Sequence, residues 1–316
     1  MSQPPAAFAL EGHASASMPV HRFAHKAMAS VFEVIIAGQE QRYARQAAEA
    51  AFDECDRLEH ELSRFVPGSD VSQINGLAAG EYVRVGVATM ECLTAAAKVN
   101  AETGGVFDVT VGALIACFRG QDGARRQPSA EEIAAARART GMHLLDLRPS
   151  DFTVGVRAAG VKVDLGGIGK GYAVDQMMAL LREWGITAAL VHGGMSSVLA
   201  MGVPPGQEGW RVSLRSPDGV DDNLGTLLLR DRSFSGSAQP PGRGFIIDPR
   251  TATLAAGPVA TWVAADSATL TDCLSTAFFV MSPGEVEEYC RQHPSVGSVV
   301  IVKDSGGRKV FRWGKW

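Results

Sequence analysis

The sequence predicts an α+β fold. Short β-rich runs crowd the chain after Val161, helical segments interrupt them without a regular strand–helix alternation, and no internal repeat is visible. A regular alternation would instead predict a doubly wound parallel sheet. We therefore expect mixed sheets with helices packed on them.

The first half of the chain contains most of the expected helices. After a β-rich run at 31–36, apolar residues at spacings of three and four predict a helix from about 40 to 65. A second helix is expected over 87–103, ending at Gly104-Gly105. Ser129 and Glu132 form a capping-box pattern that opens a short helix, which Gly141 can end.

The second half is expected to be mostly strand. Helices are predicted at 170–184 and 270–281, and stretches rich in Gly and Pro at 203–224 and 235–258 are expected to be loops. Residues 1–26 contain several prolines and small polar residues and are expected to form a flexible leader, with 27–316 as one folded domain. The β-rich runs lie at 161–165, 188–191, 197–201, 210–214, 226–229, 245–247, 262–265, 299–302 and 310–313.

Composition excludes several protein classes. Of the 316 residues 46% are hydrophobic and 20% charged, and 30 Lys and Arg face 34 Asp and Glu without a basic block, so a nucleic-acid partner is not expected. No stretch approaches the ~18 apolar residues of a membrane span, and the N-terminal stretch does not resemble a signal peptide. The five cysteines are odd in number and form no C-x-x-C, which indicates reduced thiols and a cytoplasmic protein without a membrane partner.

A glycine-rich segment lies between an expected strand and an expected helix, at 164–172. Its four glycines allow a ligand to approach the backbone, and the helix start offers free N–H groups to a phosphate. The spacing matches neither a P-loop nor the G-x-G-x-x-G fingerprint of dinucleotide-binding folds. A plain structural turn explains this segment equally well.

A second candidate segment, 271–276, lies on an expected helix. Asp272 and Thr276 are four residues apart and share one face, where a carboxylate and a hydroxyl present hard oxygen donors suited to Mg²⁺. The alternative is that Asp272 caps the helix and Thr276 bonds a backbone carbonyl. His192 is a weak acid–base candidate, and Ser196 and Ser197 lack the G-x-S-x-G spacing of a serine hydrolase.

Taken together and in this order, the segments resemble the ApbE family of FAD:protein FMN transferases. The likeness extends over roughly residues 27–315 and rests on six ordered stretches. They are M-A-S at 28–30, L-S-R-F at 62–65 with S-D-V-S at 69–72 and I-N at 74–75, G-V-F-D-V-T-V-G at 105–112, D-L-G-G-I-G-K-G-Y-A-V-D at 164–175, I-I-D-P-R at 246–250 and D-C-L-S-T at 272–276.

The resemblance implies a single α+β unit related to the T-fold that binds FAD in a groove with Mg²⁺ on its pyrophosphate. Asp272, Thr276 and the backbone carbonyl of Gly169 are then the metal ligands. The implied reaction transfers FMN from FAD to a Ser or Thr hydroxyl of an acceptor protein and releases AMP. The implied FAD contacts are Met28, Phe65, Thr110, Val111, Gly112, Gly166, Lys170, Ile247 and Ser275.

The chain departs from the family pattern at several positions. The histidine that usually precedes I-I-D-P is replaced by Gly244-Phe245, and the flavin-contacting tyrosine is Phe65. The usual T-S-G is Phe234-Ser235-Gly236, and R-T-G ends in Ala252. Loss of a general base typically lowers a rate ~10²–10⁴-fold. Two alternatives therefore accompany the transferase hypothesis, namely an FAD-binding protein without transferase activity and an FAD pyrophosphate hydrolase. His192 is the candidate for a substitute base.

Overall fold

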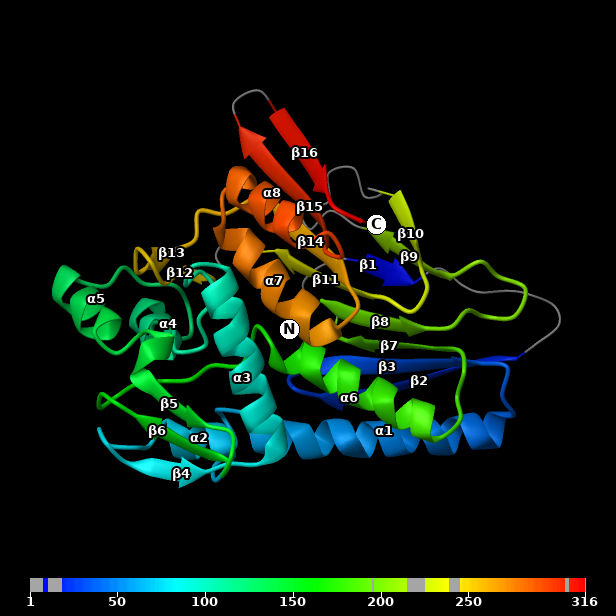
Figure 1. The fold of residues 1–316 in the computed structure, drawn as a ribbon, viewed down its shortest axis with the longest axis horizontal. Coiled ribbons are helices and arrows are strands. Elements are labelled where there is room, and N and C mark those ends of the chain that lie inside the picture. The colour runs from blue at the N-terminus through cyan, green and yellow to red at the C-terminus, as the bar shows by residue number, and fades with distance from the viewer. Residues whose placement is uncertain are drawn as a thin grey trace.

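The computed structural model describes residues 8–10, 19–194, 196–214, 225–238, 245–304 and 307–315. Its largest element is an eight-stranded sheet, and all of its strand pairs are antiparallel, in the order β16-β15-β14-β11-β8-β7-β3-β2 (Figure 1). These strands are β2 Val20–Ala27, β3 Ser30–Ala37, β7 Ala189–Gly193, β8 Ser197–Met201, β11 Ser233–Ala238, β14 Ala260–Ala265, β15 Gly297–Asp304 and β16 Gly307–Trp313.

Three smaller sheets complete the β-structure. One has the order β1-β9-β10, one the order β4-β6-β5, and β12 pairs with β13 alone. Their strands are β1 Phe8–Leu10, β9 Trp210–Leu214, β10 Gly225–Leu229, β4 Tyr82–Arg84, β5 Leu145–Arg148, β6 Thr153–Val156, β12 Ile247–Asp248 and β13 Thr253–Leu254. The mixture of sheets and helices confirms the expected α+β class.

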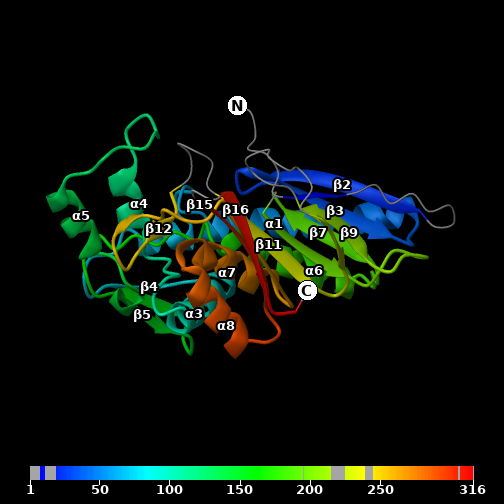
Figure 2. The same ribbon diagram turned by 90° about the horizontal axis from the view of Figure 1, so that it is seen from above.

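Helices cover one face of the large sheet. Figures 1 and 2 show α1, α6 and α7 lying along that face, with α3 beside them. The α-helices are α1 Gln41–Leu62, α2 Asp70–Ile74, α3 Val87–Glu102, α4 Gly112–Phe118, α5 Ala130–Arg137, α6 Gly169–Glu183, α7 Ala268–Val280 and α8 Pro283–Gln292. In the part of the chain that the structure describes, no helix is long and apolar enough to cross a bilayer.

The large sheet is buried on both faces because its side chains alternate. On β3, Phe32, Val34 and Ile36 pack into the core beneath the helices. Ile35 and Ala37 point the other way, into a second core shared with Trp210 and Val212 of β9 and with other strands. Central strands such as β3 and β8 are therefore nearly continuous apolar runs in the sequence.

Periodicity predicted the long helices well. The eight residues of the expected apolar face of α1 are all buried in the structure. The capping box of Ser129 and Glu132 is present at α5. A second capping box, formed by Ser282 and Glu285, opens α8, which we did not predict from the sequence although the same pattern is present there.

Two expectations differ from the structure near the site. The run at 161–165 does not form a full strand: Lys162 makes an isolated parallel bridge with Val111, and at Val163 the backbone groups are bonded by the side chain of Asn75. Its Nδ2 donates to the Val163 carbonyl at 2.9 Å, and its Oδ1 accepts from the Val163 amide at 2.6 Å. The stretch 235–258 is not all loop, since β11 continues to Ala238 and β12 and β13 follow.

The N-terminal boundary is also corrected. Strand β2 begins at Val20, inside the expected leader 1–26, because residues 20–27 pair in antiparallel register with the whole of β3. The alternation of apolar and polar residues is hard to see in this segment because it contains many polar and small residues. An edge strand tolerates such residues at its outward positions. The rest of the expected leader lies outside the described residues, apart from β1 and Pro19.

Candidate functional site

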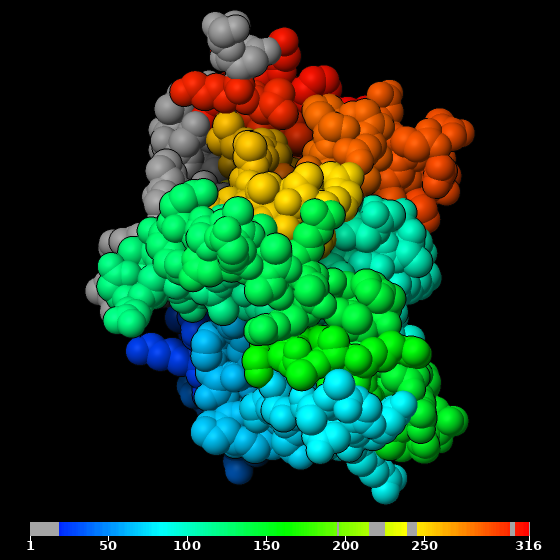
Figure 3. Space-filling model, turned by 90° about the vertical axis from the view of Figure 1, so that its left-hand side faces the viewer, coloured from blue at the N-terminus to red at the C-terminus, as the bar shows by residue number. Residues whose placement is uncertain are grey.

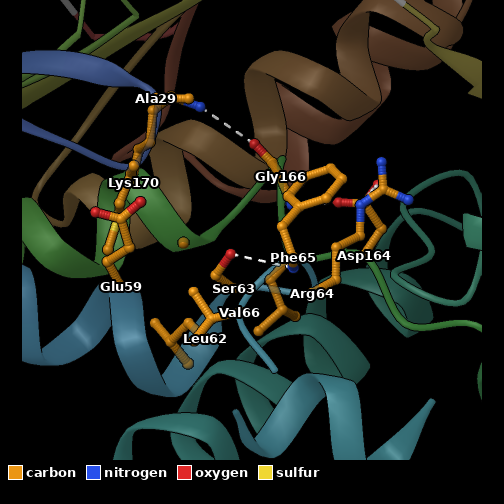
Figure 4. Close-up of a pocket in the computed structure, with 13 residues that line it drawn as sticks. Ala29, Glu59, Leu62, Ser63, Arg64, Phe65, Val66, Asp164, Gly166 and Lys170 are labelled. Atoms are coloured by element: carbon orange, nitrogen blue, oxygen red, sulfur yellow. Dashed lines mark hydrogen bonds and ion pairs between the residues drawn. The ribbon is translucent and has the colours of Figure 1, made fainter. Parts of the chain in front are cut away.

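Three adjoining pockets form one groove beside the start of α6. The central pocket has a volume of about 440 Å³, and Figure 4 shows its side chains. The α4 pocket, of about 360 Å³, shares Arg64, Asp164 and Gly166 with the central pocket. The hairpin pocket, of about 310 Å³, shares Met28, Ala29 and Glu59 with it. Together they form a space large enough for an extended cofactor rather than a single small ion.

The glycine turn at 164–169 forms one wall of the groove. The Gly166 amide donates to Asp164 Oδ1 at 2.9 Å, and Asp164 Oδ2 lies 3.3 Å from Arg64 Nε. Lys170 Nζ donates to the Gly166 carbonyl at 3.2 Å, which holds the ammonium group over the turn (Figure 4). The turn is thus fixed by charged groups at both ends, and its glycine backbone lies against the pockets.

Helix α6 starts at this turn without a side-chain cap of its own. Its N-cap residue, Ile168, has no side chain that can accept a hydrogen bond, so the N–H groups of the first turn need other partners. Asp272 of α7 supplies one, because its Oδ2 accepts from the Gly171 amide at 3.0 Å. An uncapped helix start with a positive dipole end is a favourable position for an anionic group.

Asp272 and Thr276 lie on one face of α7, as predicted. Asp272 does not cap its own helix, since the N-cap of α7 is Ser267. Thr276 Oγ1 donates to the Asp272 carbonyl at 3.3 Å, so the expected backbone bond is present. The hydroxyl also faces the glycine turn, because a Cβ added at Gly167 would lie 3.2 Å from Thr276 Oγ1.

The position of α7 is set by Asp175 of α6. Its carboxylate accepts from the amides of Ala268 and Thr269, both at 2.8 Å, and from the hydroxyls of Ser267 and Thr269 at 2.8 and 2.6 Å. These four bonds satisfy donors at the start of α7. Asp175 therefore fixes the start of α7 against α6, and with it the positions of Asp272 and Thr276.

The residues fit a hard divalent cation. No group of three or more His, Cys, Asp or Glu side chains suited to a metal occurs among the described residues, so a purely side-chain cage is not present there. One carboxylate, one hydroxyl and a backbone carbonyl, which has a second lone pair beyond its helical bond, are the incomplete oxygen set with which Mg²⁺ binds phosphates. Asp272 Oδ2 is held by Gly171, whereas its second oxygen, Oδ1, has no hydrogen-bond partner in the described structure.

The predicted stretch 110–112 supports the groove mainly through its backbone. The buried Thr110 hydroxyl donates to Asp108 Oδ1 at 2.6 Å and accepts from the Gly141 amide at 2.6 Å. A Cβ at Gly112 would lie 2.6 Å from the Lys162 carbonyl, so that position requires glycine. Burial raises the pKa of Asp108, although hydrogen bonds from Thr110 and Met142 act in the opposite direction.

The predicted site residues divide into two groups. Met28, Phe65, Val111, Gly166, Lys170, Ile247, Gly169 and Thr276 line the pockets. Thr110, Gly112, Ser275 and Asp272 lie behind the walls and line none of these three pockets. Ser275 is fully buried, and its Oγ lies 2.9 Å from Ser237 Oγ.

His192 is held away from the groove. It lies on β7, where Nε2 bonds Glu33 and Nδ1 lies 2.8 Å from the Gly194 carbonyl, and it lines none of the three pockets. Burial acts to raise the pKa of Glu33, but hydrogen bonds and charge from His192 and Arg22 outweigh it and lower this pKa to about 2. Both ring nitrogens of His192 thus have partners, Glu33 and the Gly194 carbonyl.

Two aromatic rings line the groove. Phe65 is 73% exposed, and the Arg64 guanidinium lies 4.5 Å from its ring centroid. Phe245 lines the α4 pocket, with the Arg119 guanidinium 4.8 Å from its ring centroid. The sequence motifs assigned no role to Arg64, Asp164, Glu59 or Arg119. The first two lie inside recognised motifs, but nothing in the sequence pointed to Glu59 or Arg119.

The fold and the groove together define an α+β protein in which a glycine turn faces a helix rich in hydroxyl side chains. Solved flavin transferases share this fold. The flavin transferase ApbE from Vibrio cholerae superposes with a TM-score of 0.83 at 23% identity, covering 94% of this chain and 97% of that one. The ApbE protein from Thermotoga maritima gives a TM-score of 0.82 at 27% identity, covering 93% and 97%.

Residues 28–300 match the ApbE family, and the chain belongs to that family. A curated relative from Klebsiella pneumoniae (strain 342), named FAD:protein FMN transferase, is 27% identical over 303 residues, which cover 90% of this chain and 85% of the relative. A relative of the same name from Escherichia coli (strain K12) is 25% identical over 304 residues, with the same two coverages. The family expected from the six motifs is confirmed.

Proposed function

We propose that this chain is an FAD:protein FMN transferase that acts with Mg²⁺. The observation that supports this most directly is the meeting of α6 and α7 at the groove. There the start of α6 adjoins the oxygen donors of Gly169 and Thr276, which line the groove, and of Asp272, which lies behind its wall and accepts from the Gly171 amide. The names of the curated relatives support the same activity.

The proposed roles follow from the positions of the side chains. Mg²⁺ bound by Asp272, Thr276 and the Gly169 carbonyl would neutralise charge on the pyrophosphate. The Lys170 ammonium group, at the positive end of the α6 dipole, orients the phosphates. Met28 and the exposed ring of Phe65 offer apolar surface in the central pocket, on which a flat ring system can stack.

The proposed reaction is a displacement at the phosphorus atom on the flavin side. An acceptor Ser or Thr oxygen forms a bond to this phosphorus, and the bond from phosphorus to the bridging oxygen breaks. AMP leaves with the bonding electrons, and the hydroxyl proton passes to water or to the leaving phosphate. Positioning and charge stabilisation supply most of the rate in such reactions, so a missing histidine does not abolish them.

The test is an incubation of the purified chain with FAD, with and without Mg²⁺. Flavin fluorescence follows binding, chromatography follows AMP and FMN, and in-gel fluorescence detects covalent flavin on proteins expressed together with the chain. We expect Mg²⁺-dependent binding and covalent flavin with release of AMP. Free FMN with AMP and no covalent flavin would instead indicate hydrolysis, and unchanged bound FAD would indicate binding alone.

Asp272→Asn separates the metal role from a structural role. The amide keeps an oxygen that can accept from the Gly171 amide but removes the charge, so FAD affinity should fall mainly when Mg²⁺ is present. Asp146→Asn is a matched control on β5, where the carboxylate bonds Tyr82 and Arg148 and lines none of the pockets. Equal loss of affinity with and without Mg²⁺ would show that Asp272 is structural.

A further inference from the structure

Arg119 is held at the rim of the α4 pocket by a tight hairpin that follows α4. It is the C-cap residue of α4, and the Gly120 amide donates to the Ala124 carbonyl at 2.8 Å. The Arg126 amide closes the hairpin by donating to the Phe118 carbonyl at 2.9 Å. Figure 3 shows this segment, in green, against the gold segment that contains β12 and β13. The backbone of Arg119 is therefore fixed although its side chain is exposed.

The guanidinium of Arg119 forms no ion pair with any of the described residues, although the pocket also contains two carboxylates. The other lining cation, Arg64, pairs with Asp164 at 3.3 Å. The remaining lining carboxylate, Asp108, accepts hydrogen bonds from Thr110 and the Met142 amide. Arg119 has a ring contact with Phe245 but no carboxylate partner among the residues that the structure describes. Two arginines and two aspartates line the α4 pocket, so its formal charge is balanced, but Arg119 is the lining arginine that forms no ion pair with a described residue.

A neighbouring arginine of the same hairpin does form an ion pair. Arg126 makes a two-pronged bond to Glu132, at 2.9 and 2.7 Å. Arg119, seven residues earlier, instead lies over an aromatic ring, an arrangement that orients a guanidinium without neutralising it. A guanidinium over a ring keeps N–H donors with which it can bind a planar or tetrahedral anion.

We propose that Arg119 binds a phosphate oxygen of the flavin nucleotide, with Phe245 as the surface that positions it. This inference rests on the proposed function. The α4 pocket also contains Gly167 and Thr276, so it borders the candidate metal site, where the pyrophosphate is expected. At Phe245, where the family resemblance leads us to expect a histidine, this chain has a ring that cannot take up a proton but can hold a cation.

A phenylalanine that positions Arg119, in place of a histidine base, changes the step that the protein assists from proton removal to phosphate binding. A positioned base typically contributes ~10²–10⁴ in rate, whereas an arginine on the transferring phosphoryl group contributes ~10³–10⁵. The guanidinium donates hydrogen bonds to phosphate oxygens and takes no proton. The bonds made and broken at phosphorus are those described above, and the acceptor proton still leaves to water or to AMP.

Binding of FMN and of riboflavin tests the proposal without turnover, since the two ligands differ only in the phosphate. Affinities are measured by flavin fluorescence at low salt for the wild type, Arg119→Gln, Arg119→Lys and Arg126→Gln. We expect Arg119→Gln to weaken FMN binding roughly tenfold while riboflavin binding stays within about twofold. Arg119→Lys should recover part of the FMN affinity, and Arg126→Gln, whose guanidinium is committed to Glu132, should match the wild type.

Salt dependence gives a second readout. The loss of FMN affinity with rising salt should be shallower in Arg119→Gln, because one charge contact is gone. Equal weakening of FMN and riboflavin, or unchanged FMN affinity, would overturn the proposal. If the wild type transfers flavin covalently but Arg119→Gln has the same ratio of FMN affinity to riboflavin affinity as the wild type, this inference is refuted and the transferase proposal stands. If the affinity ratio changes as expected but the wild type transfers no flavin, the transferase proposal is refuted and the phosphate site stands.

Discussion

Gly171 is the position at which α6 and α7 approach most closely at the site, and Gly171→Ala tests how much of the site depends on that approach. An added Cβ would lie 2.2 Å from the Ala268 carbonyl oxygen and 2.7 Å from Asp272 Cβ. The first of these contacts is with backbone, which cannot rotate away as a flexible side chain can. The two helices must therefore move apart.

The expected destabilisation follows from two terms. Overpacking in a close-packed interior costs about 1–3 kcal/mol. Separation of the helices also weakens the bond from the Gly171 amide to the Asp272 carboxylate, and hydrogen bonds to charged groups contribute about 1.5–3 kcal/mol. Because one movement relieves both contacts, the terms are not fully additive, and we expect a loss of about 3 kcal/mol.

Equilibrium urea unfolding measures this loss, and Mg²⁺-dependent FAD binding measures the displacement of Asp272 and Thr276 from Gly169. FAD affinity with Mg²⁺ should fall at least about tenfold. Gly284→Ala is the matched control, because Gly284 lies in the first turn of α8 with no atom within 4 Å of an added Cβ. Unfolding of Gly171→Ala within about 0.5 kcal/mol of the wild type, with normal FAD binding, would refute the reasoning.

Three further predictions concern the frame of the site. Ala29→Gly should stabilise the chain by about 1 kcal/mol in urea unfolding, because Met28 and Ala29 have φ of 51° and 55° and glycine adopts that conformation freely; no gain would contradict the assigned strain. Glu33→Gln should lower stability at neutral pH. Since the pKa of Glu33 falls from 4.5 to about 2 on folding, the carboxylate's contribution is present above pH 4.5 and is lost as pH falls toward 2, so a difference that stays constant over that range would refute the pairing with His192. Asp175→Asn should destabilise the start of α7 by about 2 kcal/mol and weaken Mg²⁺-dependent FAD binding, whereas unfolding like that of the wild type would show that its four bonds contribute little.

Local patterns in the sequence account for most of the elements. The spacing of apolar residues predicted α1 and its buried face, and alternating or continuous apolar runs predicted β3, β8 and β9. These features depend on neighbours within a few residues, which is the range over which hydrophobic periodicity acts. The six ordered motifs were also long enough to indicate the family to which the chain belongs.

The strand expected at 161–165 shows where local reasoning failed. Its residues have β-strand character, but the segment makes an isolated bridge from Lys162 to Val111 rather than a ladder, and the side chain of Asn75, 88 residues from Val163, bonds both backbone groups of Val163. Likewise β2 is a strand because β3 pairs with it along its whole length, not because its own sequence alternates strongly. Partners distant in sequence decide such cases.

The candidate site divides in the same way. Residue type and spacing were enough to select the glycine-rich segment and the segment with oxygen donors as candidates, because they limit the chemistry that a segment can perform. Three contacts became evident only in the folded chain: Asp272 bonds the start of α6 rather than of its own helix, the ring nitrogens of His192 are occupied within the sheet, and Arg119 lies over Phe245. Each of these contacts joins residues from different elements, and their distances are set by how the helices and sheets pack, which no local pattern encodes.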